Sequence, residues 1–230
     1  MRIVAAVLGG GVGQRLGAGR PKQLLTLGGQ TMVERCVAAF EAAPGVDEIL
    51  VVMARGYTAE VAELLAGYQK VTAVIAGGAT RPESTRAALA EITEGGTDDC
   101  GVLLHDAARP LVDQRIIADC VAALAVHDAA GVAVPASDTM VITENGVMHS
   151  VPPRERLFRC QTPQCFRLPV IARAHELAAA DPDFAPTDDC GVVLRYLPGT
   201  AVHIVPGSER NMKVTYPHDL AVAEALLLED

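Results

Sequence analysis

The chain has 230 residues, of which 50% are apolar but only 3% aromatic, so its core must be built mainly from Ala, Val, Leu and Ile. This composition is typical of an α/β domain in which helices cover buried parallel strands. A net charge of −9 repels nucleic-acid backbones and anionic membranes. Since no apolar run reaches the roughly 18 residues of a membrane span either, we expect neither nucleic acid nor membrane as a partner.

Six apolar runs of strand length follow one another along the chain and alternate with helical segments. They are Ile3–Leu8, Glu48–Met53, Val71–Ala76, Gly101–His105, Gly131–Pro135 and Ala201–Val205. Two Thr-x-x-Glu capping boxes, beginning at Thr31 and Thr80, and a capping residue at Asp113 predict the starts of three helices. Alternating strands and helices predict right-handed crossovers and a mostly parallel sheet.

The segment from Ser137 to Arg159 interrupts this alternation. Asn145-Gly146 separates two apolar-leaning runs, which is a strong signal for a β-hairpin. We expect one domain over residues 1–230, with a β-arm at about 137–159 that covers the site or reaches a neighbouring subunit.

A glycine-rich loop follows the first predicted strand, from Gly9 to Gln23. Its glycines let the backbone approach a ligand closely, and Arg15 and Lys22 add positive charge to an acidic chain that has only three lysines. Such a loop predicts a phosphate cradle. Ligands of parallel sheets bind outside the carboxyl ends of the strands, so this loop and the loops 77–84 and 106–110 are expected to form one shared site.

The cysteines and histidines show no pattern of a metal or disulfide framework. The six cysteines form no C-x-x-C pair, and no signal peptide precedes the first strand, which predicts reduced thiols in a cytoplasmic protein. The six histidines lack zinc-ligand spacing.

Seven motifs occur in one order along almost the whole chain. They are Gly9–Gln23, Gly77–Ser84, His105–Pro110, Asp138-Thr139, Gln161–Phe166, Thr187–Asp189 and Asn211–Thr215. In these motifs the chain resembles the 2-C-methyl-D-erythritol 4-phosphate cytidylyltransferases and their close relatives, the ribitol-5-phosphate cytidylyltransferases. The resemblance implies a Rossmann-like nucleotidyltransferase fold with a mostly parallel sheet, a homodimer joined by exchanged β-arms, and transfer of CMP from CTP to an alditol phosphate.

The resemblance also implies roles for individual residues. Arg15, Lys22 and Lys213 would surround the triphosphate, whose oxygens would carry Mg²⁺; no direct protein ligand of the metal is identified. The nucleotide would lie against Gly9, Gly10, Gly11, Gly13, Gly78 and Ser84. The acceptor would be bound by Asp106, Arg109, Thr139, Arg154 and Thr162, with Arg154 reaching across from the partner subunit.

Several of these residues also have a purely structural interpretation. His105 fits a structural residue at a strand end, Thr187-Asp188-Asp189 fits a helix N-cap, and Asp106 could cap a turn and pair with Arg109. Lys213 by itself could be a solvated lysine.

The sequence leaves alternatives open for the identity of the acceptor and for the class of reaction. Val141 stands where methylerythritol enzymes usually carry a lysine, which favours ribitol phosphate, whereas the His105–Pro110 motif favours methylerythritol phosphate, the acceptor that we predict. The spacing of Gly11, Gly13 and Gly17 also fits an oxidoreductase, but only an NADP-dependent one, since Arg55 stands where an NAD enzyme needs an acid. A catalytically silent nucleotide-binding module is disfavoured because all the cations of the site are present.

Overall fold

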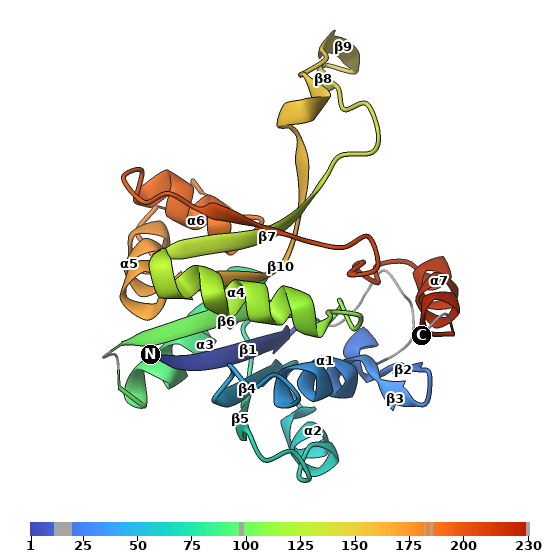
Figure 1. Ribbon diagram of the computed structural model, residues 1–230, viewed down its shortest axis with the longest axis vertical. Helices are drawn as coiled ribbons and strands as arrows, with labels where there is room; N and C mark the ends of the chain where they lie inside the picture. The colour runs from blue at the N-terminus through green and yellow to red at the C-terminus, as the bar shows by residue number, and fades with distance from the viewer. Residues whose placement is uncertain (12–19, 97–98, 182, 185, 229–230) are drawn as a thin grey trace.

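A seven-stranded sheet forms the centre of the part of the chain that the computed structural model describes, residues 1–11, 20–96, 99–181, 183–184 and 186–228. The sheet has the order β11-β7-β10-β6-β1-β4-β5 (Figure 1). The strands are β1 (Arg2–Gly9), β4 (Glu48–Met53), β5 (Val71–Ala76), β6 (Cys100–Asp106), β7 (Ala129–Pro135), β10 (Phe158–Arg167) and β11 (His203–Pro206). All six strands expected from the sequence are present, and among the described strands of this sheet only β10 runs antiparallel to its neighbours.

Strand β10 was not expected, although it lies between β6 and β7 in the middle of the sheet. Pro163 stands inside it, and a proline lacks the N–H that a regular ladder needs. The strand accommodates Pro163 at an irregularity, where its register against β7 shifts between Cys160 and Gln164. The Thr162–Pro163 peptide at this point is cis.

Helices cover both faces of the sheet. The seven α-helices of the described chain are α1 (Met32–Glu41), α2 (Thr58–Leu64), α3 (Arg81–Glu94), α4 (Gln114–Val126), α5 (Leu168–Ala179), α6 (Asp189–Tyr196) and α7 (Pro217–Leu227). The expected caps of α1, α3 and α4 are confirmed, because Thr31, Thr80 and Asp113 each accept a backbone N–H of the first helical turn. No described helix is long and apolar enough to cross a membrane.

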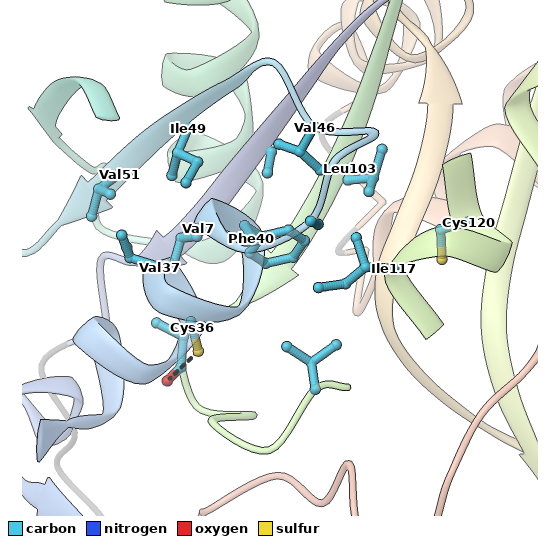
Figure 2. Packing of buried hydrophobic residues seen from close by; sticks show 14 of the residues in the cluster. Val7, Cys36, Val37, Phe40, Val46, Ile49, Val51, Leu103, Ile117 and Cys120 are labelled. Atoms are coloured by element: carbon cyan, nitrogen blue, oxygen red, sulfur yellow. Dashed lines mark hydrogen bonds between the residues drawn. The ribbon is translucent and has the colours of Figure 1, made fainter. Parts of the chain in front are cut away.

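Alternate residues of β1 enter two separate apolar clusters. Val7 packs with Phe40 of α1 and Ile117 of α4 on one face of the sheet (Figure 2). Leu8 belongs to the cluster on the other face, to which α3, α5 and α6 contribute. Burial on both faces explains why the strand sequences are almost continuously apolar. This packing fixes the strand ends from which the polar loops emerge.

The expected hairpin projects from the body of the protein as an arm (Figure 1). Its strands are β8 (Ile142–Glu144) and β9 (Val147–Ser150), and the two-residue turn places Asn145 and Gly146 at positive φ, as a hairpin of this length requires. Apolar side chains on the arm are exposed in the single chain, namely Met140, Val141, Ile142, Val147, Met148 and Val151. The remaining described elements are the strands β2 (Thr26–Leu27) and β3 (Gln30–Thr31) and the 3₁₀ turns η2 (Lys22–Leu24) and η3 (Arg154–Arg156).

Candidate active site

Glycines from two loops meet at the carboxyl ends of β1 and β5. A Cβ atom on Gly10 would lie 2.5 Å from Ser84 Oγ, and one on Gly77 would lie 2.7 Å from the same oxygen. Ser84 is buried in the first turn of α3, where its hydroxyl donates to the Thr80 carbonyl over 3.0 Å. Larger residues would therefore separate the two loops. Of the residues predicted to contact the nucleotide, Gly10 and Ser84 are thus brought together at the strand ends.

The turn before α3 is held by Glu83. Its Oε2 accepts the backbone N–H of Ala79 over 2.6 Å and that of Thr80 over 3.3 Å. A Cβ atom on Gly78 would overlap the Glu83 Cβ, so this position also requires glycine. The carboxylate thus orders the turn that contains Ala79 and Thr80.

Lys22 contacts the segment of the chain that carries Lys213. Lys22, near the end of the glycine-rich loop, donates from Nζ to the carbonyl of Val214, the residue after Lys213, over 2.7 Å. The segment carrying Lys213 is in turn fixed to the loop after β6, because the Val214 N–H donates to the Ala108 carbonyl over 2.8 Å. Gly11 ends the first described segment, and the predicted residues Gly13 and Arg15, like Gly17, lie outside the described residues.

Asp106, the last residue of β6, is the acidic centre of the site. Its Oδ2 lies 2.6 Å from Lys213 Nζ and its Oδ1 lies 3.1 Å from Arg81 Nε. Burial by itself would raise the pKa of the Asp106 carboxyl, but Arg81 and Lys213 outweigh it and hold the pKa well below its usual range. Asp106 is therefore an anion and an acceptor of hydrogen bonds rather than a proton donor.

Arg109 does not pair with Asp106, so that structural interpretation is wrong. Its Nη1 donates to the Asn211 carbonyl over 2.8 Å, and its Nη2 donates to the Cys160 carbonyl over 3.2 Å. Backbone carbonyls thus orient the guanidinium without neutralising it. The positive charge stays available to an anion at the strand ends.

His105 and Thr162 support the backbone beneath these charges. His105 Nε2 donates to the Arg109 carbonyl over 3.1 Å, so its Nδ1 accepts the Thr162 hydroxyl, also over 3.1 Å. Thr162 Oγ1 itself accepts the Asp106 N–H over 3.0 Å. Burial lowers the pKa of the His105 imidazole to about 4. A neutral, doubly hydrogen-bonded His105 matches the structural role expected for it.

Thr139 and Arg154 contact each other on the arm. Arg154 Nη2 donates to Thr139 Oγ1 over 3.0 Å, on exposed side chains. In the described contacts of this single chain, neither residue reaches Asp106 or Arg109. The structure therefore separates these two predicted acceptor residues from the rest of the site within one protomer.

Four polar residues of the site were not identified from the sequence as site residues: Arg81, Gln164, Asp189 and Asn211. Arg81 joins Asp106 to Asp189, whose Oδ2 lies 2.7 Å from Arg81 Nη1. Asn211, fully buried, donates to the Thr162 carbonyl over 2.9 Å. Each of the four lies in one of the seven sequence motifs, but only the fold shows what its side chain contacts.

The Thr187-Asp188-Asp189 motif begins helix α6, as the structural interpretation predicted. Asp188 Oδ1 accepts the Gly191 N–H over 2.9 Å, and the Gln164 side chain on β10 accepts the N–H of Asp189 over 2.8 Å. Within the described residues, no group of three or more His, Cys, Asp or Glu side chains is arranged to hold a metal ion.

The chain is similar to known proteins over almost its whole length. The family model of 2-C-methyl-D-erythritol 4-phosphate cytidylyltransferase matches residues 3–229. The protein of that name from Thermobifida fusca (strain YX) is 55% identical over 233 residues, which cover 98% of this chain and 93% of the relative. The crystal structure of the protein of that name from Thermus thermophilus matches with a TM-score of 0.75 and 32% identity, over 99% of this chain and 98% of that one. A bifunctional ribulose 5-phosphate reductase/CDP-ribitol pyrophosphorylase from Haemophilus influenzae is 35% identical, over 97% of this chain and 48% of its own length.

Proposed function

The chain belongs to the 2-C-methyl-D-erythritol 4-phosphate cytidylyltransferase family, and from this premise we propose that it transfers CMP from CTP to 2-C-methyl-D-erythritol 4-phosphate. The observation that carries the proposal is that Lys22 and Arg109 both hydrogen-bond the segment Asn211–Val214, which carries Lys213, at the end of the sheet where Gly10 and Gly77 approach each other. In a chain of net charge −9, this clustering of cations fits a site for two anionic substrates.

The reaction joins two anions. An oxygen of the acceptor phosphate forms a bond to the α-phosphorus of CTP, and the bond from that phosphorus to the β-phosphate oxygen breaks, so that pyrophosphate leaves. Lys22 and Lys213, with Arg15, would offset the negative charge that develops on the phosphorus. The nucleophile is already ionised, so no general base is required. Accordingly His105, buried and with both ring nitrogens engaged, holds the loop rather than moving a proton.

Mg²⁺ is part of the proposal and would enter with the nucleotide. When bound, it would neutralise charge on the phosphate oxygens. Asp106 lies at the strand ends, and its two oxygens contact Lys213 and Arg81, so the main ligands of the ion would be the phosphates.

The nucleotide and the acceptor would occupy opposite sides of the Lys213 ammonium group. The cytosine end would lie against Gly10, Gly78 and Ser84. The acceptor would lie against Asp106 and Arg109, with Thr162 beside them. Asp106 would accept hydrogen bonds from acceptor hydroxyls, while Arg109 would bind the acceptor phosphate through its guanidinium.

A homodimer would complete this site. Arg154 and Thr139 lie on an arm whose apolar side chains are exposed in the single chain. Exchange of arms would bury those side chains and bring Arg154 to the acceptor phosphate of the partner subunit. We place the enzyme in the cytoplasm, a location supported by six free cysteines.

Of the alternatives, NADP-dependent oxidation is not supported, because the family match and the relatives are cytidylyltransferases. Ribitol 5-phosphate is the second candidate acceptor. The relative from Haemophilus influenzae, named as a CDP-ribitol pyrophosphorylase in part, supports it at 35% identity. The 55% identity to the relative from Thermobifida fusca favours methylerythritol phosphate.

A coupled pyrophosphate assay tests the proposal. The purified protein is incubated with CTP, Mg²⁺ and either 2-C-methyl-D-erythritol 4-phosphate or ribitol 5-phosphate, with acceptor-free and ATP-containing reactions as controls. We expect pyrophosphate release with CTP and methylerythritol phosphate. Release with ribitol phosphate alone would replace the proposed acceptor, and no release with either would refute the proposed activity.

A further inference from the structure

Arg81 occupies a position at which a cation does not stabilise its helix. It is the first residue of α3, where the helix dipole disfavours positive charge. The N-terminus of α3 is already capped by Thr80 and Glu83, which form a complete capping box. The helix therefore gains nothing electrostatically from Arg81. Its interactions with other elements must account for the placement of its charge.

The Arg81 guanidinium contacts two carboxylates that belong to different elements, a strand and a helix. Nε lies 3.1 Å from Asp106 Oδ1, at the end of β6, and Nη1 lies 2.7 Å from Asp189 Oδ2, at the start of α6. The Asp106 and Asp189 side chains are 11% and 1% exposed. A planar guanidinium fixes the relative position of two such partners, which the single ammonium group of a lysine does not.

One end of this bridge is anchored and the other lies in the site. Asp189 is held at Oδ1 by His175 Nε2 over 2.9 Å, and its N–H donates to Gln164 Oε1 over 2.8 Å. Asp106, at the other end, faces Lys213. Because Asp189 is fixed by α5 and β10, Arg81 transmits that fixed position to Asp106.

Lys213 is the more exposed of the two cations that contact Asp106. It contacts Asp106 Oδ2 over 2.6 Å, but its side chain is 41% exposed, whereas that of Arg81 is 24% exposed. In the proposed reaction, Lys213 would exchange this contact with Asp106 for contacts with phosphate oxygens. Asp106 keeps an ion pair after this exchange only because Arg81 remains on Oδ1.

We propose that Arg81 is a positioning residue that holds the Asp106 carboxylate in place while Lys213 moves from Asp106 to the substrate phosphates. The inference rests on the proposed function for its kinetic consequence. Without Arg81, Asp106 would retain Lys213 as its close cationic partner among the described contacts, and this ion pair would compete with the phosphates. Asp106 would also lose the orientation in which it meets the acceptor hydroxyls.

The first test is the variant Arg81→Gln, assayed by pyrophosphate release. We expect kcat/KM for the acceptor to fall about 10- to 100-fold, the size of effect that a displaced positioning contact produces. The KM for CTP should change little, because Gly10, Gly77 and Ser84 are untouched. Arg81→Lys restores the charge but not the bridge, so its kcat/KM should stay well below that of the wild type. Wild-type kinetics in a folded Arg81→Gln variant, or full recovery in Arg81→Lys, would overturn the proposal.

The second test does not depend on activity. The carboxyl ¹³C resonance of Asp106, assigned with Asp106→Asn, is followed by NMR as a function of pH. We expect the pKa of Asp106 to be higher in Arg81→Gln than in the wild type, because one of its two close cations is gone. An unchanged titration would overturn the bridge even if the wild type proved inactive with CTP. An inactive wild type, by contrast, would count against the proposed function alone.

Two further variants separate positioning from folding. Arg86 lies on the same helix as Arg81 but makes none of the described contacts with Asp106 or Asp189. The variant Arg86→Gln should therefore have the kinetics of the wild type. If Arg81→Gln does not fold, Arg81→Gln/Asp189→Asn removes both charges of the buried pair and avoids an unpaired carboxylate. This double variant should fold and keep the kinetic loss; a folded double variant with wild-type kinetics would contradict the role of Arg81.

Discussion

Acid should destabilise this protein through one identified histidine. His105 is fully buried, and burial lowers the pKa of its imidazole from about 6.5 to about 4. In the unfolded chain the same side chain would bind a proton near its ordinary pKa. Protons therefore bind the unfolded state first as the pH falls. The stabilisation that depends on neutral His105 is complete above pH 6.5 and is lost as the pH falls from 6.5 towards 4.

The magnitude follows from the size of the shift. A depression of about 2.5 units corresponds to about 3 kcal/mol of unfolding free energy below pH 4, since each unit is worth about 1.4 kcal/mol. At pH 5 the loss from this residue should be about 2 kcal/mol. Its physical cause is specific, because protonation of Nδ1 would also place a second donor against the Thr162 hydroxyl that now donates to it.

Urea unfolding at pH 8 and pH 5 measures this contribution, with far-ultraviolet circular dichroism as the signal because the chain has no tryptophan. His105→Gln removes the titrating group and should shrink the pH dependence by about 2 kcal/mol, whatever its own effect on stability at pH 8. His149→Gln, which replaces an exposed histidine on the arm and leaves His105 in place, is the matched control and should keep the loss of stability between pH 8 and pH 5. If wild type and His105→Gln lose equal stability between the two pH values, the reasoning about His105 is refuted.

Three predictions concern catalysis. Lys22→Ala and Lys213→Ala should each lower kcat by about a hundredfold or more, because each removes one preorganised charge from the site. Lys70→Ala, which is remote from the site, should leave kcat unchanged. Near-normal pyrophosphate release by either site variant would exclude that lysine from catalysis. If Arg154 acts across a dimer, mixing Arg154→Ala with Lys22→Ala protein should restore part of the activity, because some heterodimers contain one intact site. If the subunits exchange and the mixture stays inactive, Arg154 acts in the site of its own protomer. The enzyme should require a phosphorylated acceptor and separate methylerythritol from ribitol phosphate by only about 10- to 200-fold in kcat/KM, so a preference beyond about ten-thousandfold would reveal a dedicated polar contact to the polyol.

The parts of the fold that sequence predicts well are those fixed by neighbours in the chain. The capping boxes at Thr31 and Thr80 need only a residue three positions away, and the Asn145-Gly146 turn needs only its own two residues. The approach of Gly10 to Gly77 was also predictable, since the two residues follow strands that run parallel. In these cases the sequence pattern and the local backbone requirement coincide.

The parts that sequence does not predict depend on contacts between distant segments. Arg81 meets Asp106 only because α3 begins where β6 ends, and Lys213 reaches the same carboxylate from 107 residues further along the chain. The sequence shows that these residues carry charge. It does not show that Asp106 takes Arg81 and Lys213 as partners while Arg109 turns to the carbonyls of Asn211 and Cys160.

The irregularity that concealed β10 also builds part of the site. A regular antiparallel strand would pair its backbone continuously with β7, whereas the register shift near Pro163 interrupts that pairing between Cys160 and Gln164. At this interruption the Thr162 side chain accepts the Asp106 N–H and donates to His105, while its carbonyl accepts from Asn211. Pairing that a regular ladder would supply is thus replaced by contacts to the loop after β6 and to the segment carrying Lys213. Through Thr162, the irregular part of β10 thus contacts both the backbone of Asp106 and the segment that carries Lys213.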